Sequence, residues 1–419
     1  MQSKEGGLLH EHFDAQMAFG HIAELSSMRR LAGTPGEREA QDYVRRAFGG
    51  MGVAAHDEEF SYSDAALKLA LPATCLIIGA ISVMGSLAFL WRTALVIIPG
   101  AALLAVVFLG FKWSGTFERF GLHGKMKSLN LVGEIEGRKA SGRVLLSAHY
   151  DSKSQLMPVL VRASFFILGY ALAIIFGLAF VGLGIAFAAG AATLGNKAFF
   201  AVSLLPPLMM LGLLFNFTGN RSPGALDDAS GIATILEVAR VLAASPLDNL
   251  DVTIAAFGCE EVGLCGSISY LLTHQEELRQ RPFFMLNYDM PFTSAAKLVL
   301  NTAFELPPVR TSKRLNAVLS ETAREMGFEV GAIYMPVGAG ADHMPWVKHG
   351  FEATSLVSAA TSIHSSRDTL DKVNREGLRR AGEASLAALR RLDHEATSLS
   401  KKPPPPEPSS GSEGASGGG

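Results

Sequence analysis

The chain has 419 residues, of which 48% are hydrophobic and 18% are charged, with a formal net charge of −2 at pH 7. This near-neutral charge gives no global electrostatic reason to expect a nucleic acid or another polyanion as a partner. The mean hydropathy of +0.25 is high for a purely soluble protein, and the apolar excess is concentrated in a few blocks, which favours membrane spans. The three cysteines, Cys75, Cys259 and Cys265, contain no CxxC pair and leave the redox compartment open.

The chain begins with MQSKEGGLLHEHFDAQ, which lacks the apolar core of a cleaved secretory signal peptide. Thr34 to Glu37 then form the sequence TPGE, a capping-box pattern with Pro35 at the first helical position. Apolar side chains follow at helical spacing up to Phe48. A helix is therefore predicted from Pro35 to about Gly49.

Four uncharged apolar stretches approach the length of a membrane-spanning helix, at residues 69–91, 94–111, 163–192 and 198–217. The second is at the short end of the range, and Pro206 and Pro207 should kink the fourth. Short links join the stretches into two hairpins. Buried core helices are the alternative interpretation, which such long uncharged runs disfavour.

The rest of the chain alternates between strand and helix patterns. Short runs rich in β-formers occur at 129–135, 144–148, 252–257, 283–288 and 353–357. Helical patterns separate several of them, at 232–244, 312–326 and 375–392. This alternation predicts an α/β fold with a mixed, largely parallel sheet flanked by helices.

The apolar hairpins interrupt this α/β pattern. The predicted organisation is one globular domain made of residues 1–66, 113–157 and 219–396, with transmembrane hairpins at 67–112 and 158–218. Residues 397–419 are rich in Pro, Ser and Gly and have almost nothing to bury, so a disordered tail is expected there.

Acidic and imidazole residues recur just beyond the carboxyl ends of the predicted strands, where open α/β sheets place their ligands. The candidates are His149, Asp151, Glu260, Glu261, Asp289 and His364, joined by Asp227 and Asp228 before the helix at 232–244. A single histidine after a strand is usually structural or solvated. Two histidines with three carboxylates, however, form a donor set suited to zinc and related divalent ions.

Two metal ions fit this donor set by charge. Three ionised carboxylates against two dications leave one positive charge, which a bridging hydroxide would neutralise, and that hydroxide is the nucleophile of a hydrolase. Glu260 and Glu261 are adjacent, so one can bind metal while the other faces the water as a general base. An exposed acidic pair is the alternative interpretation of these two residues on their own.

The ordered motifs resemble those of a known family. AHYDS at 148–152, GALDDASG at 224–231 and CEEVGLCGS at 259–267 are followed by NYDM, GADHMPW and IHSSRDTLD. In this order they are similar to the co-catalytic di-zinc exopeptidases, which include bacterial leucyl-type aminopeptidases and, more distantly, glutamate carboxypeptidases and glutaminyl cyclases. The resemblance covers nearly all of the non-membrane chain from about residue 20 to residue 392, and it implies the zinc-exopeptidase fold.

By position, the resemblance implies two Zn²⁺ ions per chain held by five ligands: Asp227 as the bridge, His149 and Asp289 at one ion, and Glu261 and His364 at the other. Glu260 would be the general base. Asp151 would orient His149, and the peptide between Asp227 and Asp228 is expected to be cis, as in relatives.

The same comparison gives weaker candidates and one departure. Asp342 and Asp368 are candidates for supporting the ligands, with ordinary loop carboxylates as an equally good interpretation. Many relatives have a Tyr just before the final His, where this chain has Ile363. Tyr334 is a weak candidate to supply the missing hydroxyl to substrate, although a core or rim tyrosine is the better interpretation. The two cysteines beside Glu260 are expected to pack and not to act as nucleophiles.

The leading functional interpretation is a membrane-bound zinc aminopeptidase that removes N-terminal residues from peptides. A carboxypeptidase is one alternative. A glutaminyl-cyclase-like enzyme, which in this family uses one zinc, is a second. A peptidase-like membrane receptor or scaffold without catalysis is a third.

The second hairpin separates His149 from Asp227, yet both are expected at one metal pair, so each hairpin must return to its starting face. The whole domain is therefore predicted on one side of an integral membrane protein that contacts lipid through four helices. Basic residues are more numerous on the domain side of the spans, which weakly favours the cytoplasmic face of a plasma or inner membrane. These are Lys68, Lys112, Arg119, Lys125, Lys127, Arg162 and Arg221, against Arg92 and Lys197 at the tips.

Overall fold

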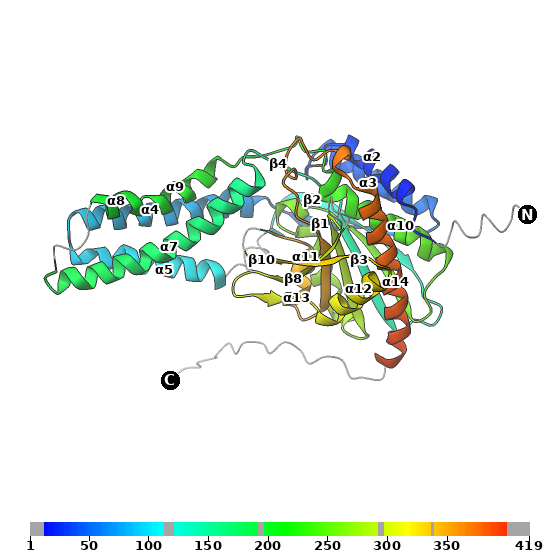
Figure 1. Ribbon diagram of the computed structural model, residues 1–419. Coiled ribbons are helices and arrows are strands. Elements are labelled where there is room, and N and C mark those ends of the chain that lie inside the picture. Colours follow the sequence, from blue (N-terminus) through cyan, green and yellow to red (C-terminus); the bar gives the residue numbers. More distant parts are fainter. Residues whose placement is uncertain (1–11, 113–120, 192–196, 292–296, 337–338, 400–419) are drawn as a thin grey trace, which may run out of the picture.

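The structure is a computed structural model that describes residues 12–112, 121–191, 197–291, 297–336 and 339–399. An α/β domain forms one end of the molecule, and a bundle of apolar helices projects from it to the left in Figure 1. Most of the tail predicted at 397–419 lies outside the described residues. The last helix, α14 (Arg375–Leu399), continues to Leu399.

A mixed sheet, nine-stranded over the described residues, forms the centre of the domain. The strand order across it is β1 (Ala54–Tyr62), β2 (Met126–Ile135), β6 (Leu250–Phe257), β3 (Gly142–His149), β7 (Phe283–Asp289), β11 (Glu352–Val357), β8 (Leu298–Phe304) and β10 (Val330–Met335), with β9 (Val309–Arg310) paired to β8. β6, β3, β7 and β11 run parallel, whereas β1, β2 and β8 make antiparallel pairs. The predicted mixed, largely parallel sheet is confirmed.

Helices cover both faces of the sheet, as alternating side chains require. Val144 and Leu146 of β3 point into the larger core, and Leu145 points into the smaller one. The larger core is closed by α2 (Ala15–Ser27), α3 (Pro35–Gly50), α10 (Ser230–Ala244), α12 (Lys313–Glu325) and α14. The smaller one is closed by α11 (Cys265–Leu278) and α13 (His343–Lys348), where the buried Trp346 stacks on Phe283.

The predicted strands and helices are all present, with bounds shifted by a few residues.

The capping box predicted at the start of α3 is wrong, because its hydrogen bonds are not formed as expected. Thr34 makes no side-chain cap, and Glu37 instead accepts hydrogen bonds from the amide of Gly33 at 2.6 Å and from the hydroxyl of Ser128 at 2.5 Å. Glu37 is buried, so a tertiary partner on β2 competes successfully with the local cap.

The apolar stretches form α4 (Leu71–Leu90), α5 (Ile97–Lys112), α7 (Val159–Ala188), α8 (Lys197–Ser203) and α9 (Leu205–Gly212), which lie side by side in the projecting bundle (Figure 1). Three helical segments of the described chain are long and apolar enough to cross a membrane: Lys68–Leu90, Val159–Ala188 and Lys197–Phe215. The second predicted span, at 94–111, forms only the shorter apolar helix Ala94–Gly110, so four spans are not confirmed. The predicted kink is present, because the chain breaks at Leu204 between α8 and α9, just before Pro206.

Close packing between α5 and α7 depends on glycine. A Cβ added at Gly100 would lie 2.8 Å from the carbonyl oxygen of Gly177 and 2.9 Å from the amide nitrogen of Val181. Both are backbone atoms, so the helices would have to separate to make room. Small residues at helix contacts allow this approach in membrane proteins, where packing replaces the hydrophobic effect between helices.

Replacing Gly100 by Leu is therefore expected to destabilise the helical bundle, because overpacking costs about 1–3 kcal/mol. The measurement is the midpoint of thermal unfolding of the full-length protein in detergent micelles. Gly182→Leu on α7 is the matched control, since a Cβ there meets nothing within 4 Å. If the midpoint temperature of unfolding decreased equally in the two variants, the close contact between Gly100 and Gly177 would not be important for stability.

Candidate metal centre

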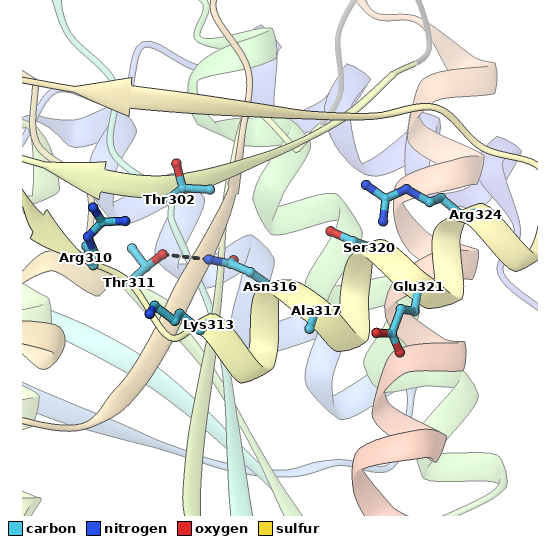
Figure 2. Close-up of a pocket in the computed structure, with 9 residues that line it drawn as sticks. All are labelled: Thr302, Arg310, Thr311, Lys313, Asn316, Ala317, Ser320, Glu321 and Arg324. Atoms are coloured by element: carbon cyan, nitrogen blue, oxygen red, sulfur yellow. Dashed lines mark hydrogen bonds between the residues drawn. The ribbon is translucent and has the colours of Figure 1, made fainter.

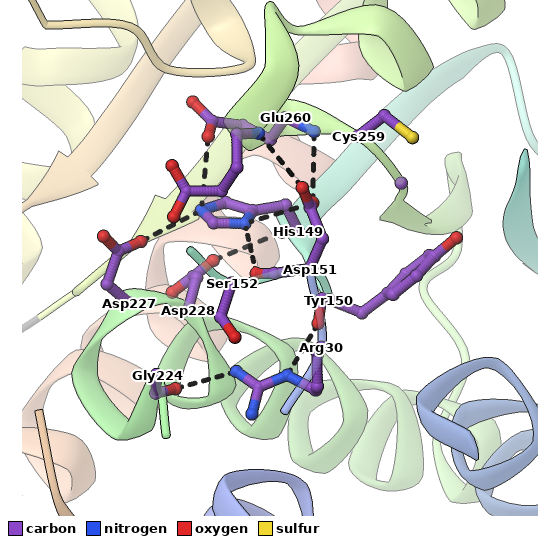
Figure 3. A network of polar contacts seen from close by, with 12 residues as sticks. Arg30, His149, Tyr150, Asp151, Ser152, Gly224, Asp227, Asp228, Cys259 and Glu260 are labelled. Atoms are coloured by element: carbon purple, nitrogen blue, oxygen red, sulfur yellow. Dashed lines mark hydrogen bonds and ion pairs between the residues drawn. The ribbon is translucent and has the colours of Figure 1, made fainter. Parts of the chain in front are cut away.

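The candidate ligands converge at one edge of the sheet. The carboxyl ends of the four parallel strands meet there. His149 is the last residue of β3, Asp289 is the last residue of β7, and Glu260 lies in the turn after β6. Figure 3 shows Asp227, Asp228 and Glu260 gathered around His149. The structure thus brings together strand-end residues that the sequence pattern identified.

Asp227 lies between the two imidazoles, with one carboxylate oxygen toward each. Its Oδ1 is 3.2 Å from Nε2 of His149, and its Oδ2 is 3.0 Å from Nε2 of His364. Two groups of metal-binding atoms result, each with its atoms within 4.8 Å of one another. We call them the first triad, made of His149, Asp227 and Asp289, and the second triad, made of Asp227, Glu261 and His364. One carboxylate therefore serves both groups.

The centre concentrates negative charge away from water. Burial raises the pKa of Asp289 well above its usual range and raises that of Glu260 to about 7. Asp227 is also buried, but hydrogen bonds from His149 and His364 hold its pKa well below the usual range. Several buried carboxylates at one point are unfavourable unless cations compensate them. The donor atoms and their charge therefore fit divalent metal ions.

Asp151 and Asp228 fix the segments that carry the ligands. The carboxylate of Asp151 accepts hydrogen bonds from the amides of Glu260 and Glu261, at 3.1 Å each. The carbonyl oxygen of Asp151 lies 3.1 Å from Nδ1 of His149. The carboxylate of Asp228 accepts from the amide of His149 at 3.2 Å. These bonds tie the ends of β3 and β6 to one geometry.

The two weaker candidates have different surroundings. The carboxylate of Asp368 accepts hydrogen bonds from the amides of Leu226 and Asp227, at 2.8 and 3.2 Å. It thereby holds the loop that carries the shared carboxylate, in which the peptide between Asp227 and Asp228 is cis, as predicted. Asp342 is buried, but its carboxylate oxygens have no hydrogen-bond partner among the described residues.

Sequence reasoning missed Arg30, a fully buried cation beneath the centre. Its guanidinium donates to the carbonyl oxygens of Tyr150 at 2.7 Å and of Gly224 at 2.8 Å (Figure 3). It also donates to the carbonyl oxygen of Pro223 at 2.7 Å. It thus joins the segment after His149 to the loop that carries the shared aspartate, two segments separated by the second hairpin. Arg30 lies far from every ligand motif, so no local pattern pointed to it.

Two further cations next to the second triad were also missed. Nζ of Lys153 lies 2.7 Å from Oε2 of Glu261, and Nη1 of Arg162 lies 3.0 Å from Nδ1 of His364. Lys153 directly follows the AHYDS motif, so its place in the sequence was a usable signal. Arg162 lies in the first turn of α7 and was interpreted only as a charge near a membrane span.

The remaining candidates belong to neither triad. The hydroxyl of Tyr334 on β10 donates to the carbonyl oxygen of Glu305 at 2.6 Å. Ile363 packs against the larger core. Cys259 and Cys265 are buried, and burial raises the pKa of the Cys265 thiol to about 12, which fits packing and not nucleophilic attack.

A pocket of about 390 Å³ lies elsewhere, along α12 (Figure 2). None of its lining residues belongs to a triad, and it contains no histidine: they are Thr302, Arg310, Thr311, Lys313, Asn316, Ala317, Ser320, Glu321 and Arg324. Its mixture of cations and hydroxyl groups does not form a metal site. The triads at the strand ends therefore remain the candidate centre.

Comparison with protein families agrees with this geometry. Residues 208–389 match the sequence model of Peptidase family M28, and this region includes every triad residue except His149. The chain is 32% identical over 195 residues to Aminopeptidase YwaD of Bacillus subtilis, a match that covers 43% of this chain and 40% of that protein. It is 29% identical over 183 residues to Endoplasmic reticulum metallopeptidase 1 of Mus musculus, covering 41% of this chain and 19% of that protein. The chain thus spans less than half the length of these curated relatives.

Solved structures share the fold over nearly the whole chain. A zinc aminopeptidase from Bacillus subtilis superposes with a TM-score of 0.55 at 16% identity, covering 91% of this chain and 96% of that one. A glutaminyl cyclase from Porphyromonas gingivalis superposes with a TM-score of 0.51 at 15% identity, covering 91% and 99%. At such identities these likenesses show the fold alone. Together with the family match, they confirm the resemblance to the zinc exopeptidases that the ordered motifs predicted.

Proposed function

We propose that the protein is a membrane-bound zinc aminopeptidase with two metal positions that share Asp227, a proposal supported by the match of residues 208–389 to the sequence model of Peptidase family M28. One observation carries the proposal: the two oxygens of this carboxylate face two different imidazoles, at 3.2 and 3.0 Å. A single carboxylate held between two sets of nitrogen and oxygen donors is suited to a pair of divalent ions.

The first triad would hold one zinc ion and the second triad the other. Both offer only imidazole and carboxylate donors, which zinc accepts, and the described cysteines stay outside them. When bound, the ions would polarise the scissile carbonyl and lower the pKa of a water molecule. The protein contributes a buried set of donor groups, and the segments that carry them are held by hydrogen bonds to Asp151, Asp228 and Asp368.

Glu260 is assigned as the general base. Its Oε2 lies 3.8 Å from Nε2 of His149, beside the first triad but outside both triads. Burial raises its pKa to about 7, which allows the carboxylate both to accept and to release a proton near neutral pH. Glu260 takes the proton from the attacking water and returns it to the amine that leaves as the peptide bond breaks.

The substrate class is tested with a panel of aminoacyl p-nitroanilides, matched N-acetylated derivatives and a peptide that begins with glutamine, using the full-length protein in detergent. An aminopeptidase releases p-nitroaniline only from substrates with a free α-amino group. Conversion of the glutaminyl peptide to its cyclic form without hydrolysis would favour the cyclase activity named for the Porphyromonas gingivalis neighbour. Absence of turnover together with absence of bound zinc would leave the scaffold interpretation.

The apolar helices are proposed to hold the domain at the membrane surface. Three segments are long and apolar enough to span, and both hairpins start and end at the α/β domain (Figure 1). Such a tether would favour peptides that are close to the bilayer. We place the domain on the cytoplasmic face because the basic residues flanking the spans are more numerous on the domain side.

Replacing Asp368 by Asn is expected to weaken zinc binding by about 10–100-fold, as removal of supporting hydrogen bonds to metal ligands does. An amide offers one acceptor oxygen in place of two, so one of the amides of Leu226 and Asp227 loses its partner. The measurement is a zinc titration of the metal-free full-length protein. Asp371→Asn, at an exposed position nearby, is the control and should leave the affinity unchanged. Equal affinities for wild type and Asp368→Asn would contradict this role.

A further inference from the structure

The hollow of about 390 Å³ along α12, which we call the α12 site, shares no lining residue with either triad. One side of α12 forms one of its walls, and the strands β8 and β9 form the other (Figure 2). Ligand pockets in proteins usually measure about 300–1,000 Å³, so the α12 site is large enough for a small organic molecule.

Three cations, Arg310, Lys313 and Arg324, line the α12 site. Their side chains make no ion pair or hydrogen bond within the part of the chain that the structure describes. A neighbouring cation is different, because the guanidinium of Arg314 lies 2.9 Å from the carboxylate of Glu395. One exposed cation without a partner is ordinary, but three around a single hollow repel one another, and an anion between them would relieve this repulsion.

The lining of the α12 site also includes one carboxylate, that of Glu321. Figure 2 shows this side chain directed away from Ser320 and Arg324. Nη1 of Arg391 on α14 lies 3.5 Å from Oε2 of Glu321, so this negative charge already faces another cation. Three positive charges against one shared negative charge give the hollow a positive potential that attracts anions.

The cations lie at both ends of the α12 site. Arg310 and Lys313 are next to the start of α12, where the first turn contains no acidic residue to compensate the positive end of the helix dipole. Arg324 lies about three turns further along, or about 16 Å of helix rise. Its guanidinium is turned back toward Ser320 (Figure 2). A ligand that contacts both ends must therefore carry two anionic groups joined by a spacer.

The base of the α12 site is already hydrogen-bonded. The hydroxyl of the buried Thr311 accepts from the side-chain amide of Asn316 at 2.8 Å (Figure 2). It also donates to the carbonyl oxygen of Asn301 at 2.7 Å. The amide oxygen of Asn316 accepts in turn from the hydroxyl of Thr354 at 2.5 Å. These groups are therefore held in place without a ligand, and such preorganisation lowers the entropy cost of binding.

We propose that the α12 site binds a small organic molecule with two phosphoryl groups, one held by Arg310 and Lys313 and the other by Arg324. A phosphoryl group carries up to two negative charges and three acceptor oxygens, which suit guanidinium and ammonium donors. The hydroxyl of Ser320 can hydrogen-bond to a polar spacer between the two groups. The site lies outside the metal centre, so this inference goes beyond the proposed function and does not depend on it.

The test is isothermal titration calorimetry of the full-length, zinc-loaded protein in detergent with fructose 1,6-bisphosphate, fructose 6-phosphate and the dicarboxylate adipate. We expect the bisphosphate to bind at least about 10-fold more tightly than the monophosphate, because it alone places a phosphoryl group at each end. The double variant Arg310→Gln with Arg324→Gln should weaken the bisphosphate by at least about 10-fold, since it loses charge-assisted hydrogen bonds at both ends.

Arg38→Gln with Arg46→Gln, at two exposed positions of α3, is the matched control. It removes the same charge and should bind the bisphosphate as wild type does. Both double variants should keep the zinc content and turnover of the wild type, because none of these arginines belongs to a triad.

A wild-type protein that binds none of the three anions would overturn this inference and leave the proposed function standing. Equal affinities for the bisphosphate and the monophosphate would overturn the two-ended site, and tighter binding of adipate would overturn the choice of phosphoryl groups. An unchanged bisphosphate affinity in Arg310→Gln with Arg324→Gln would place the anion elsewhere, such as at the metal centre. If that variant fails to fold, the single change Lys313→Gln at an exposed position decides, since it should weaken the bisphosphate by about 3–10-fold and an unchanged affinity would overturn the site.

Discussion

Replacing Glu260 by Gln is expected to lower kcat by about 10²–10⁴-fold while the protein keeps its zinc, because general acid–base catalysis contributes an effect of that size. The amide has nearly the shape of the carboxylate, but it cannot accept the proton of the attacking water. Glu260 belongs to neither triad, so its charge is not needed to hold an ion. The measurement combines steady-state kinetics on the preferred aminoacyl p-nitroanilide with metal analysis of the same sample.

Glu276→Gln on α11 is the matched control, since Glu276 is an exposed glutamate on the helix that follows the catalytic turn. It should retain both turnover and metal. Unchanged turnover in Glu260→Gln would remove Glu260 from the mechanism. A loss of turnover accompanied by an equal loss of zinc would instead show that Glu260 supports the metal centre and does not transfer a proton.

Replacing Asp227 by Asn is expected to abolish turnover and to weaken binding of zinc at both positions. Removing a group that only supports a ligand already costs about 10–100-fold in metal affinity, so loss of a shared ligand charge should exceed about 100-fold. The physical reason is that one carboxylate faces both imidazoles, with one oxygen each. Zinc titration of the metal-free variant measures the effect.

The variant Asp289→Asn distinguishes the loss of a shared ligand, expected in Asp227→Asn, from a general loss of negative charge at the centre. Asp289 belongs to the first triad alone, so its variant should weaken one zinc ion and spare the other. Asp248→Asn, at an exposed position, should leave zinc binding as in wild type. If Asp227→Asn weakened only one ion, a shared carboxylate would be the wrong description of the centre.

The residues of the candidate centre could be predicted because each lies next to a recognisable strand. Runs of β-branched and other apolar residues indicate buried strands, and the carboxyl ends of parallel strands meet at one edge of a sheet. The strands that carry His149 and Asp289 have bounds close to the predicted ones. Their convergence therefore followed from sequence pattern and general topology. Their role as ligands stays a prediction that metal analysis must test.

Elements without a clear apolar period were missed. β1 is an edge strand with the sequence AAHDEEFSY, and most of its side chains are exposed. β10 also borders the sheet and mixes exposed with half-buried positions. An edge strand is specified by pairing with a neighbour far away in the chain, so its own composition carries little signal. The bounds of the helix Ala94–Gly110 were also hard to predict from sequence, because an uncharged apolar run does not determine the residue at which a helix begins.

By itself, the sequence determined which side chains have the chemistry to bind metal and which segments are apolar enough to suggest membrane spans. It also determined the order in which the candidate ligands and the apolar segments follow one another along the chain. Only the tertiary structure decided which cations approach the acidic centre. Arg30, Lys153 and Arg162 come from three different segments, and each was interpreted locally as an ordinary basic residue or passed over. Coulomb interactions depend on distance in space and on burial, and neither can be obtained from spacing along a chain.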